Sequence, residues 1–212
     1  YILDDIFDEI NAYQYLVDQT TKNFGMFLQS DWKVSQKLSL LSGVRMDAHN
    51  LVNKVIFNPR ASLLYKLKPN AQFRINYGTG FRAPQAFDTD LHIAFAGGGI
   101  SRVMLAPDLK PETSHSISSS FNYDKPMKKW IAGFTLEGFY TQLKDAFYLQ
   151  PIGEDQFGEM FNKQNGNGAI VRGLTMELRA NFNRKVQLES GFTLQSSEFE
   201  DAIQYIDGPA GI

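Results

Sequence analysis

The stretch 76–116 reads NYGTGFRAPQAFDTDLHIAFAGGGISRVMLAPDLKPETSHS and carries the strongest structural signal of the chain. The segment 71–78 that runs into it alternates apolar and polar residues, which is the pattern of a half-buried strand. A Gly-Phe-Arg-Ala-Pro corner at 80–84 is followed by a polar, glycine-rich excursion, and the run 109–113 leads into a second alternating segment. We therefore predict two strands that are joined by a long loop over 82–113.

Alternation of the same kind covers most of the chain. It predicts eight strands, near 22–34, 37–49, 55–67, 70–81, 114–124, 129–149, 167–182 and 185–199. One phase of each strand is apolar, and the opposite phase is polar and often charged, as at Arg45, Arg74, Glu137, Glu177 and Arg179. The fold class expected is all-β and antiparallel, with one apolar and one polar face. Pro59 lacks a ladder N–H and predicts a strand start or a bulge.

The connections between these strands alternate in length. Short connections lie at 35–36, 68–69, 125–128 and 183–184, and long ones at 49–54, 82–113, 151–166 and after Glu198. Transmembrane barrels sort their connections in this way, with short turns at one end and long loops at the other. Because the chain both begins and ends inside long loops, we expect a section of an up-and-down barrel that has more strands than these eight.

Aromatic residues favour the same interpretation. Six of them lie in the apolar phase within a few residues of a short turn: Trp32, Tyr65, Phe73, Tyr123, Trp130 and Phe182. Barrels carry such a girdle of rings where the membrane meets water. Aromatics favour strands in general, but that preference predicts no clustering at one end.

The composition excludes several classes of protein. The 212 residues are 43% hydrophobic and 13% aromatic, which argues against bulk disorder. No apolar window is long enough for a transmembrane helix, although a spanning strand needs only about 9–11 residues. Zero cysteines exclude a disulfide scaffold, and a net charge of −2 argues against a nucleic-acid binder. The acidic segment 1–21 is interpreted as an outer loop, with a short helix over 5–16 as the alternative.

Four constellations could suggest chemistry, and none predicts an enzyme. Residues 78–83 match a dinucleotide-binding pattern, but Pro84 follows at once, so the glycines instead predict a bend or bulge. His115 lies between two serines, yet the chain has no G-x-S-x-G elbow. Asp88, Asp90 and His92 could hold a metal, but alternating polarity in an exposed loop is more often mere solvation. The acidic run 4–9 leaves Ca²⁺ in an outer loop open, although it lacks the EF-hand pattern.

Two motifs carry a resemblance to a known family. The first comprises Gly80, Phe81, Arg82 and Pro84, and the second comprises Leu109, Lys110, Pro111 and Glu112. This arrangement resembles the barrel of a TonB-dependent outer-membrane receptor, in which a strand ending in GFR-x-P opens a long loop that closes with Leu-Lys-Pro-Glu. The resemblance implies a 22-stranded barrel with a plugged lumen, of which this chain is about a third.

The resemblance also implies a function in the bacterial outer membrane. Such receptors take up a scarce nutrient, for example a ferric siderophore, haem, cobalamin or a glycan, without covalent chemistry and without a cofactor. The plug that contacts the TonB complex has no counterpart in this chain. The implied layout is one barrel domain over 1–212, with outer loops at 1–21, 82–113 and 200–212 and four strands each in 22–81 and 114–199.

The expected site residues follow from that layout. Arg82 and Glu112 bracket the long loop, where an arginine–carboxylate pair could close its base. The loop residues expected to face a ligand are Phe81, Arg82, Asp88, Asp90, His92 and Phe95. The residues expected to face the lumen are Arg45, Arg74, Glu137, Glu177 and Arg179, and the apolar phase would face outer-membrane lipid.

Two alternatives stay open at this point. One is a soluble antiparallel β protein, such as a carbohydrate-binding sandwich, whose apolar faces would pack against each other. The other is a self-contained eight-stranded barrel with enzymatic or adhesive activity. That barrel would need chain termini near the short turns and a catalytic set in the loops.

Overall fold

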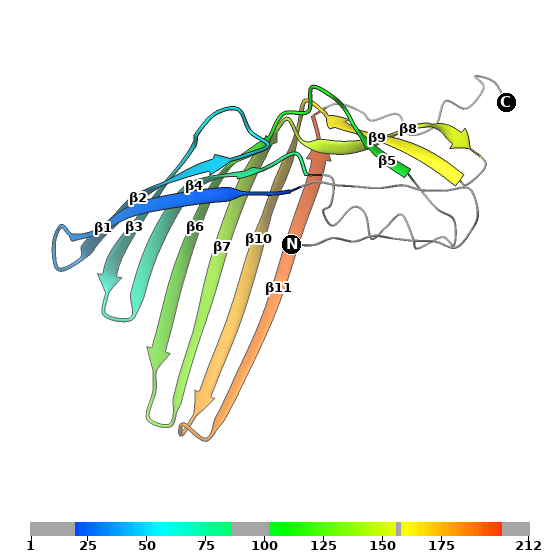
Figure 1. Cartoon of the computed structure of the whole chain (residues 1–212). Coiled ribbons are helices and arrows are strands. Elements are labelled where there is room, and N and C mark those ends of the chain that lie inside the picture. The colour runs from blue at the N-terminus through cyan, green and yellow to red at the C-terminus, as the bar shows by residue number, and fades with distance from the viewer. Residues whose placement is uncertain (1–19, 86–101, 156–157, 201–212) are drawn as a thin grey trace.

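The computed structural model describes residues 20–85, 102–155 and 158–200, and all regular structure in these ranges is β-strand. None of these residues belongs to a helix that is long and apolar enough to cross a membrane. Eight strands form one sheet in the order β1-β2-β3-β4-β6-β7-β10-β11, with every neighbouring pair antiparallel. These strands are β1 (Asn23–Lys33), β2 (Leu38–His49), β3 (Ile56–Lys68), β4 (Ala71–Arg82), β6 (Glu112–Pro126), β7 (Trp130–Lys144), β10 (Gly168–Phe182) and β11 (Val186–Phe199). The all-β antiparallel fold is thus confirmed, and the described sheet is a curved wall that does not close on itself (Figure 1).

Three further strands lie where the sequence predicted loops or a continuous strand. β5 (Arg102–Leu105), β8 (Phe147–Asp155) and β9 (Gly158–Asn165) form a second sheet in the order β5-β9-β8. The predicted loops 82–113 and 151–166 therefore contain strand structure. The predicted strand 129–149 was wrong in extent, because β7 ends at Lys144 and Asp145 adopts a φ of 52°. The second sheet lies at the end of the wall away from the short turns (Figure 1).

Two local predictions about backbone geometry need correction. The β4–β6 pairing runs without a register shift from Ala71 to Arg82, so there is no bulge at Gly78 or Gly80. A Cβ at Gly80 would lie 3.0 Å from the Ser114 Oγ, so the glycine allows close contact between β4 and β6. Pro59 lies inside β3 opposite Val44, not at a strand start, and the register shift in this region falls between Lys66 and Lys68. The pairing of β3 with β4 starts at Arg60, so the N–H that Pro59 lacks would fall outside that pairing.

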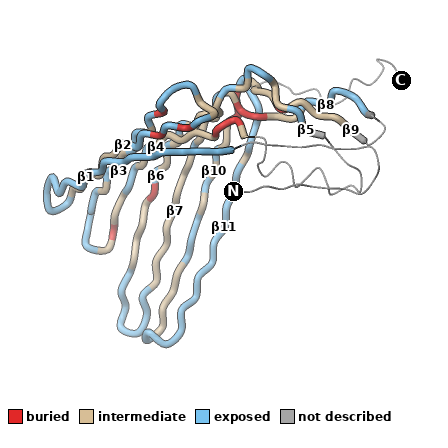
Figure 2. The backbone as a smooth tube through the Cα atoms, in the orientation of Figure 1, coloured by how far each residue is buried: buried red, intermediate tan, exposed pale blue. Residues whose placement is uncertain are grey.

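The large sheet has no core of its own. Its apolar face is uncovered: Phe192 is 68% exposed and Leu194 is 65% exposed. The buried apolar residues of the described chain are Ile56, Ala71, Ala83, Ala146, Phe147 and Ala169. Most of them gather where the second sheet joins the wall (Figure 2). A soluble sandwich would cover such a face with a second layer, so that alternative is not favoured.

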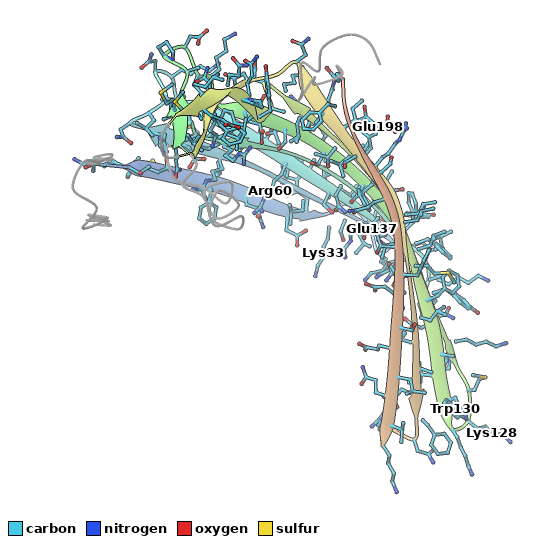
Figure 3. The ribbon with its side chains drawn as sticks, turned by 90° about the vertical axis from the view of Figure 1, so that its right-hand side faces the viewer. Lys33, Arg60, Lys128, Trp130, Glu137 and Glu198 are labelled. Carbon is cyan, nitrogen blue, oxygen red and sulfur yellow. The ribbon has the colours of Figure 1, made fainter. Side chains whose placement is uncertain are left out.

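The aromatic girdle is present at the short-turn end. The rings of Trp130 and Phe182 lie 4.7 Å apart, and the Phe134 ring lies 5.9 Å from Phe121 and 6.0 Å from Tyr123. The register places all of them on the apolar face. Figure 3 shows Trp130 beside a short turn, while Arg60 and Lys33 project from the side toward which the sheet bends. The predicted clustering at one end is therefore confirmed for Tyr123, Trp130 and Phe182.

Candidate ligand-facing rim

The two family-like motifs meet at the junction between the two sheets. Arg82 ends β4 and lies directly opposite Glu112, the first residue of β6. The Arg82 Nη2 donates to the Glu112 Oε2 at 3.1 Å, and the same oxygen accepts the backbone N–H of Phe147 at 3.0 Å. One carboxylate thus joins the wall to the first residue of β8, and the pair predicted to close the loop base is confirmed.

Two cationic side chains contact the ring of Phe147 at this junction. The Arg82 Cζ lies 4.7 Å from the Phe147 ring centroid, and the Lys163 Nζ of β9 lies 4.9 Å from it. Phe147 and Lys163 are both buried. Cation–π attraction strengthens when the groups are removed from water. The ring is therefore held between the wall and the second sheet.

Asn165 is the second connection, and its role was missed from the sequence. Its Nδ2 donates to the backbone carbonyls of Lys110 at 3.0 Å and Asp145 at 2.7 Å, while its Oδ1 accepts the Lys110 N–H at 2.7 Å. No local signal marks an amide that joins three distant segments.

A polar pocket of about 670 Å³ opens beside the junction. The Asp47 carboxylate is fully buried in its wall and accepts hydrogen bonds from Arg45 Nε and Nη2, both at 2.8 Å. Asn23 and Asn58 donate to the same carboxylate at 3.2 and 3.4 Å. The remaining lining residues include Thr21, His49, Thr79, Phe81, Arg82 and Gln85, and the Phe81 ring lies edge-on to His49. The pocket therefore presents polar side chains that the buried Asp47 carboxylate holds in place.

The five residues predicted to face a lumen share one face of the sheet. The register aligns Arg74 with Ser120 and Ser120 with Glu137, and alternation places Arg45, Glu177 and Arg179 on that same side. Arg179 Nε donates to Asp124 Oδ1 at 2.9 Å. Between these charges the face carries a chain of short polar contacts: Ser62 to Asn76 at 2.6 Å, Asn76 to Ser118 at 3.1 Å and Ser116 to Thr141 at 2.8 Å. The polar face is thus hydrogen-bonded across neighbouring strands.

Residues 2–210 match the family described as TonB dependent receptor-like, beta-barrel. The chain belongs to this family. The outer-membrane location and the family that the sequence resembles are thereby confirmed. Proteins of the family are receptors and transporters rather than enzymes.

Relatives of known name support the same assignment. An iron-regulated outer membrane virulence protein of Vibrio cholerae serotype O1 is 27% identical over 180 residues, which are 81% of this chain and 27% of that protein. The siderophore receptor PirA of Pseudomonas aeruginosa superposes with a TM-score of 0.69 at 15% identity, covering 85% of this chain and 35% of PirA. The FrpB iron transporter of Neisseria meningitidis superposes with a TM-score of 0.60 at 16% identity, covering 84% of this chain and 26% of FrpB.

A further solved structure has a different cargo in its name. The copper transporter OprC superposes with a TM-score of 0.60 at 14% identity, over 92% of this chain and 33% of OprC. These structural likenesses establish the barrel fold. The receptor section described here spans about a quarter to a third of the length of the proteins it matches.

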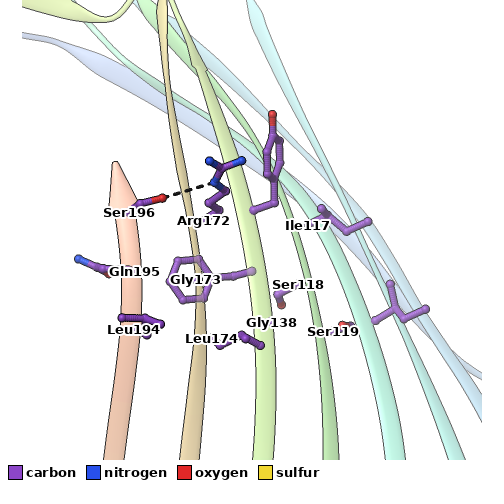
Figure 4. Close-up of a pocket in the computed structure, with 13 residues that line it drawn as sticks. Ile117, Ser118, Ser119, Gly138, Arg172, Gly173, Leu174, Leu194, Gln195 and Ser196 are labelled. Carbon is purple, nitrogen blue, oxygen red and sulfur yellow. Dashed lines mark hydrogen bonds between the residues drawn. The ribbon is translucent and has the colours of Figure 1, made fainter. Parts of the chain in front are cut away.

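A second hollow of this receptor section lies on its apolar face, away from the rim. It is a groove of about 800 Å³ that crosses β4, β6, β7, β10 and β11 (Figure 4). Its lining includes Ile75, Ile117, Gly138, Leu174 and Leu194. The groove therefore lies on the opposite side of the wall from Arg74 and Glu137.

Some predicted positions fall outside the described residues. These are Asp88, Asp90, His92 and Phe95 of the long loop and the acidic run 4–9. Within the described ranges, no three His, Asp or Glu side chains are grouped to hold a metal ion. The rim that the structure does describe is built from Phe81, Arg82, Leu109, Lys110, Pro111 and Glu112 together with Phe147, Lys163 and Asn165.

Proposed function

We propose that this chain is a section of the wall of an outer-membrane receptor that takes up ferric siderophores. The polar face would line the lumen and meet the plug, and the apolar face would contact lipid. Names of relatives support the iron class: one is an iron-regulated outer-membrane protein and another is a siderophore receptor. Contact with the TonB complex would run through the plug that such a barrel encloses.

The observation that carries the proposal is the position of the polar pocket. It opens at the long-loop end of the wall, beside the Arg82–Glu112 junction, and holds guanidinium, amide and imidazole groups from four strands. Ligand sites combine a shaped hollow with a few fixed polar groups. Capture there would be non-covalent, with hydrogen bonds from the rim to the oxygen atoms of a chelate.

The test is a comparison of ligands on the full-length receptor. Tryptophan fluorescence would be titrated with a ferric catecholate, a ferric hydroxamate, haem, cobalamin, a copper salt and an oligosaccharide. We expect a ferric siderophore to bind at least about tenfold more tightly than the other classes. Tightest binding of haem, cobalamin, copper or the glycan would overturn the siderophore assignment but leave the uptake role intact.

The uptake role needs its own measurement. Cells that lack their other receptors would be supplied with the radiolabelled ligand that binds most tightly, with and without a functional TonB. Accumulation only with TonB is the expected result. Equal accumulation in both strains, or none in either, would show that the chain does not belong to an energised receptor.

A further inference from the structure

The polar face of the wall is basic over β1 to β4. Four of its side chains are exposed cations that form no ion pair with any described residue: Lys33, Arg60, Lys66 and Arg74. Asp47 on this half is already bonded to Arg45, which leaves Asp31 as the one acid here without an ion pair among the residues that the structure describes. This half of the face therefore carries a net positive charge.

The polar face beyond β6 has the opposite sign. Its acids lie on β7, β10 and β11, at Glu137, Glu177 and Glu189. Arg179 on this half is bonded to Asp124 and does not offset them. Arg74 and Glu137 lie on either side of Ser120 of β6 and form no ion pair with each other. A strand that carries serines on this face thus separates a basic half from an acidic half.

Glycines let two arginines of the basic half lie flat along the wall. A Cβ at Gly43 would lie 3.4 Å from Arg60 Nε, and Arg60 Nη2 donates to Gln29 Oε1, so this side chain crosses β2 to reach β1. A Cβ at Gly25 would likewise lie 2.8 Å from Arg45 Nη2. Both charges are therefore presented at the surface of the wall, without bulk that projects far from it.

The unpaired cations follow one another from the polar pocket toward the short turns. Arg60 lies on β3 two residues beyond Asn58, which lines the pocket. Arg74 aligns with Leu64, four residues further along β3, and Lys66 follows after two more. At about 3.4 Å for each residue of an antiparallel strand, these steps are about 14 and 7 Å long. The positive charge therefore runs down the wall and does not form a single site.

Such a series of exposed cations suits an anion that moves. Pores that conduct anions use Arg and Lys side chains, and conduction needs several weak sites because the ion must enter readily and also leave. A surface of one sign also raises the local concentration of molecules of the opposite sign. Iron(III) bound by catecholates is such an anion, whereas its complex with hydroxamates is neutral.

We propose that the basic half of the polar face is the lane along which an anionic ferric siderophore passes from the polar pocket to the short-turn mouth of the barrel. This inference rests on the proposed uptake function and adds to it the charge of the cargo and the side of the lumen that it follows. Short turns of outer-membrane barrels face the periplasm, which is the direction of uptake. The acidic half beyond β6 repels the same cargo.

The experiment measures uptake of a radiolabelled ferric catecholate by cells that carry the full-length receptor. Arg60→Gln and Arg74→Gln each remove one charge of the lane, and we expect each to slow uptake about threefold and the double variant about tenfold. Surface binding of the same chelate should keep its wild-type affinity, because neither side chain lines the pocket. Arg60→Lys and Arg74→Lys keep the charge and should retain at least half of the wild-type rate.

Ionic strength separates an effect of charge from a structural effect. Salt at about 0.1 M screens exposed charges beyond about 10 Å, so added salt should slow wild-type uptake and change the double glutamine variant less. Arg172→Gln is the matched control, since it removes an arginine of β10 from the opposite, apolar face and should leave the uptake rate unchanged.

The outcomes distinguish the lane from its alternatives. Cations that hold the plug, and do not guide the cargo, would make the double glutamine variant sensitive to vancomycin, which is too large for porins; we expect no such sensitivity. That sensitivity, wild-type uptake in the double glutamine variant, equal losses in the lysine variants, or faster uptake of a neutral ferric hydroxamate than of the catecholate would overturn the lane. Uptake of no chelate by the wild-type receptor would instead refute the uptake function on which the lane rests.

Discussion

The eight-stranded and the three-stranded sheet differ in how their strands are brought together. In the large sheet most neighbours are consecutive hairpin strands, such as β10 and β11. In the small sheet β5 pairs in parallel with β9, so that Arg102 aligns with Met160, 58 residues later. Closing a long loop costs chain entropy before any pairing is gained. The small sheet is therefore expected to depend on its junction with the wall, while the wall depends on its apolar face.

The largest effect should come from a charge in the middle of that apolar face. Met176→Arg is expected to destabilise the receptor by about 2–4 kcal/mol, because an arginine at the bilayer midplane is poorly solvated. Urea unfolding of the full-length receptor in bilayers would measure the loss. The matched control is Thr175→Arg, one residue away on the polar face, where we expect less than about 1 kcal/mol. Equal losses in the two variants would mean that the two faces are wrongly assigned.

The next effect concerns the carboxylate that joins the two sheets. Glu112→Ala removes the oxygen that accepts from the Arg82 Nη2 and from the Phe147 N–H, which is expected to cost about 2–3 kcal/mol. The loss should be local, so hydrogen exchange over β8 and β9 should accelerate by more than about tenfold while β10 and β11 keep their protection. Glu112→Gln retains a carbonyl oxygen and should give a smaller change. Uniform acceleration over all strands would contradict a local junction.

A smaller effect is expected at the amide connection. Asn165→Ala removes three hydrogen bonds at the wall-facing end of β9, which water can partly replace, so we expect a cost of about 1–2 kcal/mol. Asn165→Asp keeps the acceptor for the Lys110 N–H but turns a carboxylate oxygen toward the two carbonyl oxygens, so it should be at least as destabilising as alanine. Hydrogen exchange of the Lys110 and Gly166 amides is the measurement. An aspartate variant as well protected as wild type would argue against this bonding pattern.

The smallest effect belongs to the polar face of the wall. Ser116→Ala breaks one hydroxyl contact with Thr141 and should cost about 0.5–1 kcal/mol. Ser119→Ala, on the apolar face of the same strand, should be neutral or slightly stabilising. Differential urea midpoints in bilayers would resolve the two. A larger loss of stability in Ser119→Ala than in Ser116→Ala would contradict the assignment of the polar and apolar faces.

Particular residues show why some features could be predicted and others could not. The sequence predicts the Arg82–Glu112 pair because the two motifs bracket one loop. In the structure, the strands that carry them lie side by side. The end of β7 was misplaced because residues 145–149 keep the composition of a strand, while the break lies in the backbone conformation of Asp145. Phe147, Lys163 and Asn165 were missed because each acquires its role only when three separate segments meet.

By itself, the sequence determined the eight wall strands, their two faces, the sorting of short and long connections, and the family. The strands, faces and connections depend on side-chain alternation and turn chemistry, and the family resemblance depends on two short motifs. All of these are properties of a few consecutive residues. Only the tertiary structure decided that β5, β8 and β9 form a second sheet, that one carboxylate joins it to the wall, and that Arg60 crosses Gly43 to lie flat along the polar face. These features depend on which strand edges and side chains meet once the whole sheet has formed, and no local pattern carries that information.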